Sequence, residues 1–228
     1  MTAEGARLVC VPGLGLNEAS WRPTLQALRA AGSRREQAVL ELPGYGVRPA
    51  RGADLRPEAL AAVLVDALRR RPARPTVLAA HSASCGIVAH AVLQAPELVS
   101  ALVLVGPMTD PRAGTWPRMA GRWLRTAGWE RPSQVPVLAR TYATTGPAWI
   151  ARTMDHARRE DLRTVVRQVH APVLVVRGRH DRICPQDWAD ELVAAAPGRA
   201  RSVTLDAGAH MVPLTHGARL AAALTEAW

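Results

Sequence analysis

The 228-residue sequence contains no lysine and no phenylalanine, so all 29 of its Lys and Arg positions are arginine. A formal charge of +10 would suit an anionic partner such as nucleic acid. The arginines are nevertheless scattered, apart from short clusters such as residues 69–71, and no nucleic-acid-binding motif accompanies them. The missing lysine, together with abundant alanine, proline and glycine, indicates a composition bias of the coding genome. We therefore expect no nucleic-acid partner.

Cysteine is also rare, and no apolar run is long. Cys10, Cys85 and Cys184 form no C-x-x-C pair, which predicts neither a disulfide framework nor a zinc site. No apolar run approaches the length of a membrane span, and the first expected strand begins too near the start for a signal peptide to precede it. We therefore expect a cytoplasmic protein without a membrane partner. The motifs HExxH and GxxxxGKS/T are absent, so we predict no metal and no cofactor.

Short apolar runs alternate with segments of helical periodicity along most of the chain. Continuous apolar strands of this kind are typical of a parallel sheet covered by helices on both faces. The fold class is therefore α/β, with a mostly parallel sheet of about six or more strands, and the length suits a single domain. We expect strands at 8–11, 38–42, 77–80, 101–105, 172–176 and 201–205, and helices near 20–32, 57–71, 84–95, 185–196 and 212–227.

The alternation stops between residues 107 and 164, a segment called the insert below. It has no clear strand and holds four of the seven tryptophans among many arginines. Because it follows a strand, it would overhang the carboxyl ends of the sheet, where open parallel sheets bind ligands. We predict a helical lid at 107–164 on a core formed by 1–106 and 165–228.

A serine stands on the turn between one expected strand and the next helix. Residues 77–80 form the strand, Ser82 occupies the turn, and the helix begins near Ser84. The nucleophile elbow, Gly-x-Ser-x-Gly, holds its serine in this way, and Ala80 and Ser84 are small enough to replace the two glycines. The alternative is an ordinary strand–helix turn in which Ser82 caps the helix.

A serine nucleophile needs a nearby base and a third group that orients the base. Asp181 follows the strand at 172–176, and His210 follows the strand at 201–205. Both loops lie at the same strand ends as Ser82, so we expect the three side chains to meet there. The second choices are Asp110, which is expected to be a turn residue, and His216, which is expected to lie within the last helix.

With these residues the sequence resembles the α/β-hydrolase superfamily over nearly the whole chain except the insert. The chain order Ser, Asp, His is the order of that family. Its acid loop, Gly-x-x-Asp followed by Pro, is matched by Gly178, Asp181 and Pro185. Its Gly-x-His before the last helix is matched by Gly208 and His210. The resemblance implies an α/β-hydrolase fold with Ser82, Asp181 and His210 as the catalytic triad.

The family's oxyanion loop, His-Gly-x, is matched in part, because Pro12 stands where His is usual and Gly13 and Leu14 follow. By the resemblance, the oxyanion hole consists of the backbone N–H groups of Leu14 and Ala83, which do not depend on side-chain identity. The same loop also begins like a dinucleotide-binding fingerprint. Glu18 stands at the third glycine position, where a carboxylate would oppose a pyrophosphate, so we exclude dinucleotide binding.

The resemblance implies acyl transfer to water. Ser82 argues against the dehalogenase and epoxide hydrolase branches, which attack with a carboxylate, and the missing lysine argues against hydroxynitrile lyases. We predict a hydrolase of a carboxylic ester or thioester, similar to small cytoplasmic esterases and thioesterases. Its partner is a small-molecule acyl substrate, free or linked to a carrier protein or CoA. The alternative is a non-hydrolytic cyclase, lyase or isomerase that uses the same triad.

The tryptophans of the insert are candidates for binding the acyl group, because large rigid apolar surfaces bind such groups well. The alternative is that they form a small core of the insert itself. The four candidate substrate-binding residues are Trp116, Trp123, Trp129 and Trp149.

Overall fold

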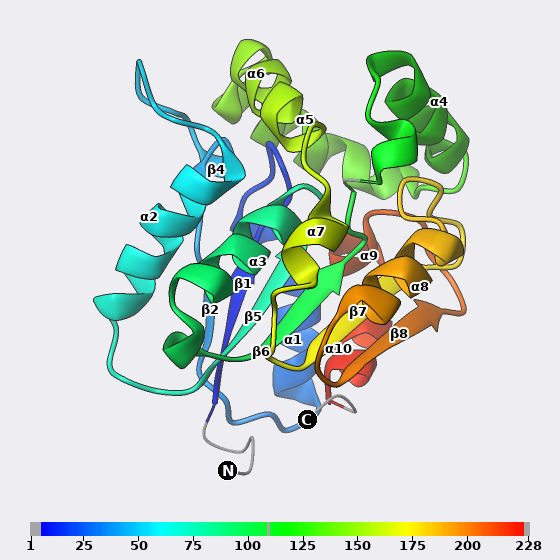
Figure 1. Cartoon of the computed structure of the whole chain (residues 1–228). Helices are drawn as coiled ribbons and strands as arrows, with labels where there is room; N and C mark the ends of the chain where they lie inside the picture. The colour runs from blue at the N-terminus through cyan, green and yellow to red at the C-terminus, as the bar shows by residue number, and fades with distance from the viewer. Residues whose placement is uncertain (1–5, 109, 226–228) are drawn as a thin grey trace.

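A six-stranded sheet, in which every neighbouring pair of strands is parallel, forms the centre of the molecule (Figure 1). The computed structural model describes residues 6–108 and 110–225. The strand order is β2-β1-β5-β6-β7-β8, which confirms the predicted mostly parallel sheet. Its strands are β1 (Arg7–Val11), β2 (Gln37–Val39), β5 (Thr76–His81), β6 (Val99–Val105), β7 (Val173–Gly178) and β8 (Ala200–Leu205).

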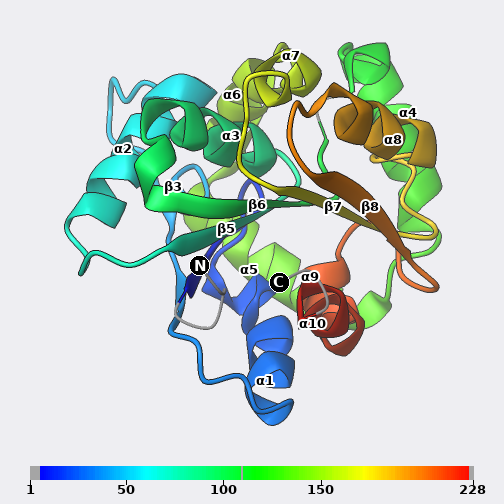
Figure 2. The ribbon, with the colours of Figure 1, turned by 60° about the horizontal axis from the view of Figure 1, so that its bottom comes forward.

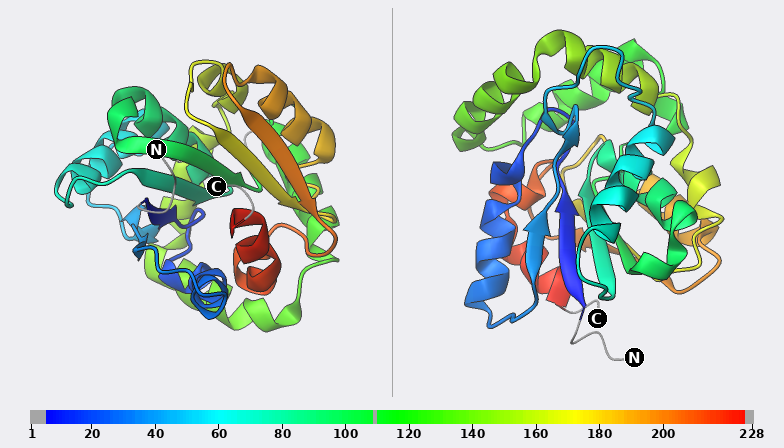
Figure 3. Two further views of the ribbon diagram at one scale, coloured as in Figure 1. Left: turned by 90° about the horizontal axis from the view of Figure 1, so that it is seen from below. Right: turned by 90° about the vertical axis from the view of Figure 1, so that its left-hand side faces the viewer.

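Helices cover both faces of this sheet, as predicted (Figures 2 and 3). Successive side chains of a strand point to opposite faces, so Leu8 and Cys10 of β1 join one apolar cluster while Val9 and Val11 join the other. The first cluster is covered by α1 (Arg22–Ala30) and α10 (Gly217–Thr225), and the second by α2 (Pro57–Arg69), α3 (Ser84–Gln94), α7 (Leu162–Val166) and α8 (Gln186–Ala195).

The insert is helical and lies over the carboxyl ends of the strands (Figure 1). Met119 and Met154, from two of its helices, belong to the same apolar cluster as Val9 and Val11 of the sheet. Its last helix, α7, packs on α3 and α8 beside the sheet, so the overhanging part ends before Leu162. Its other helices are the short η4 (Pro111–Ala113), α4 (Trp116–Ala127), the short η5 (Pro132–Gln134), α5 (Val135–Thr145) and α6 (Pro147–Ala157).

Two expected elements differ from the structure. The strand expected at 38–42 ends at Val39, and the chain then forms a separate small pair, β3 (Leu42–Pro43) with β4 (Gly46–Val47), around a tight turn. The last helix is divided into α9 (Val212–Thr215) and α10, with His216 at the break. α10 starts at Gly217, where a Cβ would lie 2.5 Å from the backbone of α1, so only a glycine allows the two helices to approach this closely.

The remaining short helices, η2 (Glu18–Ser20) and η3 (Pro96–Leu98), lie in connections. Across residues 6–108 and 110–225, no helix is both long enough and apolar enough to cross a membrane.

Candidate active site

Ser82 has a strained backbone at the junction of β5 and α3. Its φ is +61°, and no other non-glycine residue in the described ranges has a positive φ. This left-handed conformation is costly for a residue with a side chain and is typical of a nucleophile elbow. Ala80 and Ser84 are completely buried, as expected for small residues at a close approach, and the Ser84 hydroxyl donates a 2.8 Å hydrogen bond to the carbonyl of His81.

The structure brings Ser82, His210 and Asp181 together. Ser82 Oγ lies 2.8 Å from His210 Nε2, and His210 Nδ1 lies 2.9 Å from Asp181 Oδ2. When Nδ1 carries the proton and donates it to the carboxylate, Nε2 is free to accept the proton of the serine hydroxyl. Residues from the ends of β5, β7 and β8 thus form one continuous hydrogen-bonded chain.

The acid loop holds Asp181 firmly. Asp181 Oδ1 accepts hydrogen bonds from the backbone N–H groups of Ile183 and Cys184, at 2.8 and 2.9 Å. Burial opposes ionisation of this carboxyl, but His210 and the two N–H donors outweigh burial and hold the pKa of Asp181 below its ordinary value. The buried guanidinium of Arg177 donates to the carbonyls of Asp181 and Cys184 at 2.8 and 2.7 Å. These two hydrogen bonds hold the backbone of the acid loop in place.

His210 is buried beside three other titratable groups, Asp181, Glu130 and His81. Burial lowers its pKa, but the Asp181 carboxylate, with a smaller contribution from Glu130, outweighs burial and raises the pKa of His210 above its ordinary value. His81 lies 4.9 Å away, ring centre to ring centre, and its Nε2 is 3.0 Å from the carbonyl of His210. Burial, reinforced by His210, lowers the pKa of His81 to about 3, so His81 is a neutral support for the histidine loop.

The two expected oxyanion donors belong to Leu14, which lines one cavity together with Ser82, and to Ala83, which directly follows Ser82 in the chain. Leu14 follows β1, and Ala83 precedes the first turn of α3. Within the described residues, neither backbone N–H group donates a hydrogen bond to a protein acceptor. Both are therefore available to an oxyanion, and the positive end of the α3 dipole adds to the effect.

A cavity of about 540 Å³ adjoins Ser82 and His210. Its lining is mostly apolar and comes from the oxyanion loop, the insert and the histidine loop, including Leu14, Leu138, Ile150, Met154 and Met211. A cavity of this size and character can hold a small apolar group next to the serine.

The four candidate tryptophans of the insert lie in different places. Trp123 lines the cavity, whereas Trp116, Trp129 and Trp149 are not part of its lining. Arg158 lies over the ring of Trp116, and Trp129 stacks on His180 with ring centres 3.8 Å apart. Trp149 is partly buried and packs on the core cluster. The structure thus places one of the four beside the serine.

The second-choice residues lie outside the hydrogen-bonded chain. Asp110 caps the turn at η4 and pairs with Arg112 and Arg122, at 2.9 and 2.6 Å. His216, which was expected within the last helix, lies at the break between α9 and α10, where Arg131 donates to its Nε2 at 3.3 Å. Burial raises the pKa of the Cys85 thiol, so it stays protonated.

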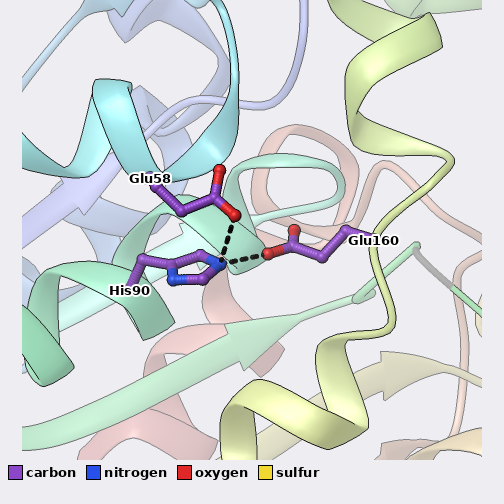
Figure 4. A group of neighbouring side chains, drawn as sticks. All are labelled: Glu58, His90 and Glu160. Atoms are coloured by element: carbon purple, nitrogen blue, oxygen red, sulfur yellow. Dashed lines mark hydrogen bonds and ion pairs between the residues drawn. The ribbon is translucent and has the colours of Figure 1, made fainter.

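Glu58, His90 and Glu160 form a group that could in principle hold a metal ion, because their ligand atoms all lie within 4.8 Å of one another. Figure 4 shows both carboxylates directed at one ring nitrogen of His90. Glu160 Oε1 lies 2.5 Å from His90 Nε2, a hydrogen-bonding distance that is too short for two ligands of one ion. We interpret the group as an ion pair that ties the end of the insert to α3.

Two residues at the site carried no signal in the sequence. Arg177 is one of 29 basic residues, and nothing in its neighbours marks it as buried under the acid loop. Glu130 lies in the insert outside any motif, yet its carboxylate accepts hydrogen bonds from the backbone of His210 and Met211. Neither residue belongs to one of the motifs named above, and no periodic pattern in the sequence predicts that either is buried at the site.

The chain is similar to known proteins over almost its whole length. The family model described as the alpha/beta hydrolase family matches residues 8–223. A curated relative is the pimeloyl-(acyl-carrier protein) methyl ester esterase of Methylococcus capsulatus. It is 25% identical over an alignment 252 residues long, gaps included, which spans 99% of this chain and 95% of the relative.

Solved structures are similar over almost the whole chain. A hydrolase from Oleispira antarctica has a TM-score of 0.79 at 14% identity, over 97% of this chain and 90% of that chain. The enol-lactonase from Burkholderia xenovorans LB400 has a TM-score of 0.75 at 18% identity, also over 97% and 90%. At these identities the likeness shows the fold.

Proposed function

Because this chain belongs to the alpha/beta hydrolase family and is therefore a hydrolase, we propose that it cleaves a carboxylic ester or thioester through an acyl-enzyme on Ser82. The observation that carries the proposal is the pair of hydrogen bonds that link Ser82 Oγ, His210 and Asp181 beside an apolar cavity. A serine hydroxyl becomes an effective nucleophile when a base and an orienting acid are arranged in this way.

In the proposed reaction, Ser82 Oγ attacks the acyl carbonyl carbon while His210 Nε2 takes the hydroxyl proton. The imidazolium then gives that proton to the leaving oxygen or sulfur, which departs as an alcohol or thiol. A water molecule then attacks the acyl carbonyl carbon while the same nitrogen takes its proton. The acyl–serine bond breaks as the imidazolium returns that proton to Ser82 Oγ, which releases a carboxylic acid and the free serine. Asp181 holds the imidazole tautomer and stabilises the imidazolium in both halves.

The backbone N–H groups of Leu14 and Ala83 are the proposed oxyanion donors. They would stabilise the negative charge that develops on the carbonyl oxygen in each tetrahedral intermediate. One such donor contributes about 3 kcal/mol to the transition state. Their freedom from protein acceptors supports this role, because they need not break a hydrogen bond in order to act.

The proposed substrate carries an apolar acyl group that fits the cavity of about 540 Å³. Trp123 is the tryptophan that we propose to contact it, because it lines that cavity. The name of the curated relative, an esterase for a pimeloyl ester on acyl-carrier protein, supports an acyl chain that is linked to a carrier. We further propose that the insert acts as a lid on a single domain, since its helices lie over the strand ends that carry Ser82 (Figure 3).

The test is hydrolysis of aryl esters and thioesters with acyl chains of graded length by the purified protein. Ser82→Ala should lower kcat by roughly 10⁴ to 10⁶, and a fluorophosphonate probe should label Ser82. Ser100→Ala is a matched control, because Ser100 is an exposed serine at the amino end of β6, whereas Ser82 lies at the carboxyl end of β5. Full activity in Ser82→Ala would contradict the mechanism, whereas stable acylation without release would favour the non-hydrolytic class.

A further inference from the structure

Glu130 joins the insert to the loop that carries His210. It lies between α4 and η5, about 80 residues before the histidine, and one of its oxygens, Oε1, accepts two backbone hydrogen bonds. The donors are the N–H groups of His210, at 2.7 Å, and Met211, at 2.9 Å. Both residues are buried, so without Glu130 these N–H groups would lack a partner at a considerable cost.

Glu130 also lines the cavity of about 540 Å³ next to Ser82, called the acyl cavity below, and it is the one acidic residue among the described residues of that lining. Among the described residues Glu130 forms no ion pair with the neighbouring Arg131, whose guanidinium instead donates to His216 Nε2 at 3.3 Å. Burial, with a smaller contribution from the Asp181 charge, raises the pKa of Glu130 above its ordinary value, although the two N–H donors and His210 favour its charged form. A carboxylate in a mostly apolar lining is costly unless it is paired or hydrogen-bonded, and the two backbone N–H groups supply those hydrogen bonds.

The charge of Glu130 acts on His210 together with three other groups. Asp181, from the loop after β7, contacts Nδ1 directly, and Ser82, from the end of β5, contacts Nε2. His81 packs against the ring and is neutral. Asp181 and Glu130 are therefore the two negative charges that favour an imidazolium at this position.

We propose that Glu130 is a positioning residue for the base: its carboxylate, carried by the insert, holds the backbone of the histidine loop and places a second negative charge near His210. This inference rests on the proposed function, because the base role of His210 belongs to it. In this arrangement the position of the insert and the orientation of the imidazole are coupled, since the insert cannot move away from the loop without releasing two buried N–H groups.

Two substitutions separate the two roles. In Glu130→Gln the amide oxygen can still accept both N–H groups, but the charge is gone, so the pKa of His210 should fall. His210 must be neutral to accept a proton, so the acid limb of kcat/KM should move to lower pH, by at least about 0.3 units. Glu130→Ala removes the acceptor as well, and kcat/KM should fall by about 10-fold or more while Glu130→Gln keeps most of it.

The titration is followed by NMR of the His210 ring protons, a measurement that needs no turnover. Glu97→Gln is the matched control, because Glu97 pairs with Arg69 near the amino end of β6. An unchanged His210 pKa in Glu130→Gln would overturn the charge role, and parental kcat/KM in Glu130→Ala would overturn the positioning role. If Glu130→Ala does not fold, Glu130→Asp, whose shorter side chain cannot reach both donors, replaces it. A protein that hydrolyses no ester contradicts the proposed function, and the titration still decides on Glu130.

Discussion

Two buried aspartates follow neighbouring strands of the sheet, and their surroundings differ. Asp181 is completely buried and contacts His210 Nδ1 at 2.9 Å. Asp110 is 2% exposed, and its carboxylate pairs with Arg112 and Arg122 in the insert. The first carboxylate can orient an imidazole, and the second can hold the start of the insert in place.

The substitutions Asp181→Asn and Asp110→Asn therefore have separate expected effects. Asp181→Asn should lower kcat by on the order of 10⁴, because an amide favours the wrong imidazole tautomer. Asp110→Asn should leave kcat within about threefold and lower the thermal midpoint, because it weakens two ion pairs of a buried carboxylate. Steady-state kinetics and thermal unfolding of both variants check this. The opposite pattern of kcat values would assign the acid role to Asp110.

Helix α4 carries two tryptophans at similar exposure but in different surroundings. Trp123 is 40% exposed and lines the acyl cavity, whereas Trp116 is 44% exposed and packs under Arg158. Of these two tryptophans, Trp123 is therefore the one that lies on the cavity side of α4.

The pair provides an experiment with a built-in control. Trp123→Ala should lose preference for a bulky acyl group over acetyl by about 1–3 kcal/mol in kcat/KM, because the cavity loses an apolar wall. Trp116→Ala removes the same side chain from the same helix and should leave that preference unchanged. Equal loss in both variants on every ester would mean that Trp123 has a structural role alone.

Across the whole molecule, the insert and the sheet share one apolar cluster. Met119 and Met154 of the insert pack in the same cluster as Val9 of β1 and Trp188 of α8. The ion pair of Glu160 with His90 adds a second connection between the end of the insert and α3 (Figure 4). Within the part of the chain that the structure describes, the insert forms no apolar cluster of its own, so we expect that it does not fold independently.

We therefore expect the chain to unfold in one cooperative transition. Far-ultraviolet circular dichroism and tryptophan fluorescence should give coincident urea curves, since the tryptophans lie in both the insert and the core. In Trp188→Phe, four of the six remaining tryptophans lie in the insert, so the fluorescence is weighted towards the insert. The lost packing should lower the midpoint of this variant, and both probes should report the same lowered midpoint. An earlier transition in fluorescence than in circular dichroism would show that the insert unfolds as a separate unit.

The sequence by itself determined the sheet, the family and the residues around the turn at Ser82. The apolar runs at 8–11 and 101–105 are continuous, and a run of that kind is stable only when both faces of the strand are buried. Small residues at 80 and 84 are required where strand and helix backbones meet, so they mark the elbow locally. Each of these features spans only a few residues, and short-range patterns are the ones that a sequence displays directly.

The tertiary structure decided which insert side chains face the serine. Trp123 and Trp116 have the same residue type on one helix, and only the position of α4 over the acid loop distinguishes them. The Glu130 carboxylate accepts a hydrogen bond from the backbone of His210, 80 residues further along the chain. The Arg177 guanidinium donates to the backbone carbonyl of Asp181 in the acid loop. Such contacts depend on how whole elements pack, and the insert has neither a strand register nor a motif that would fix its helices in advance.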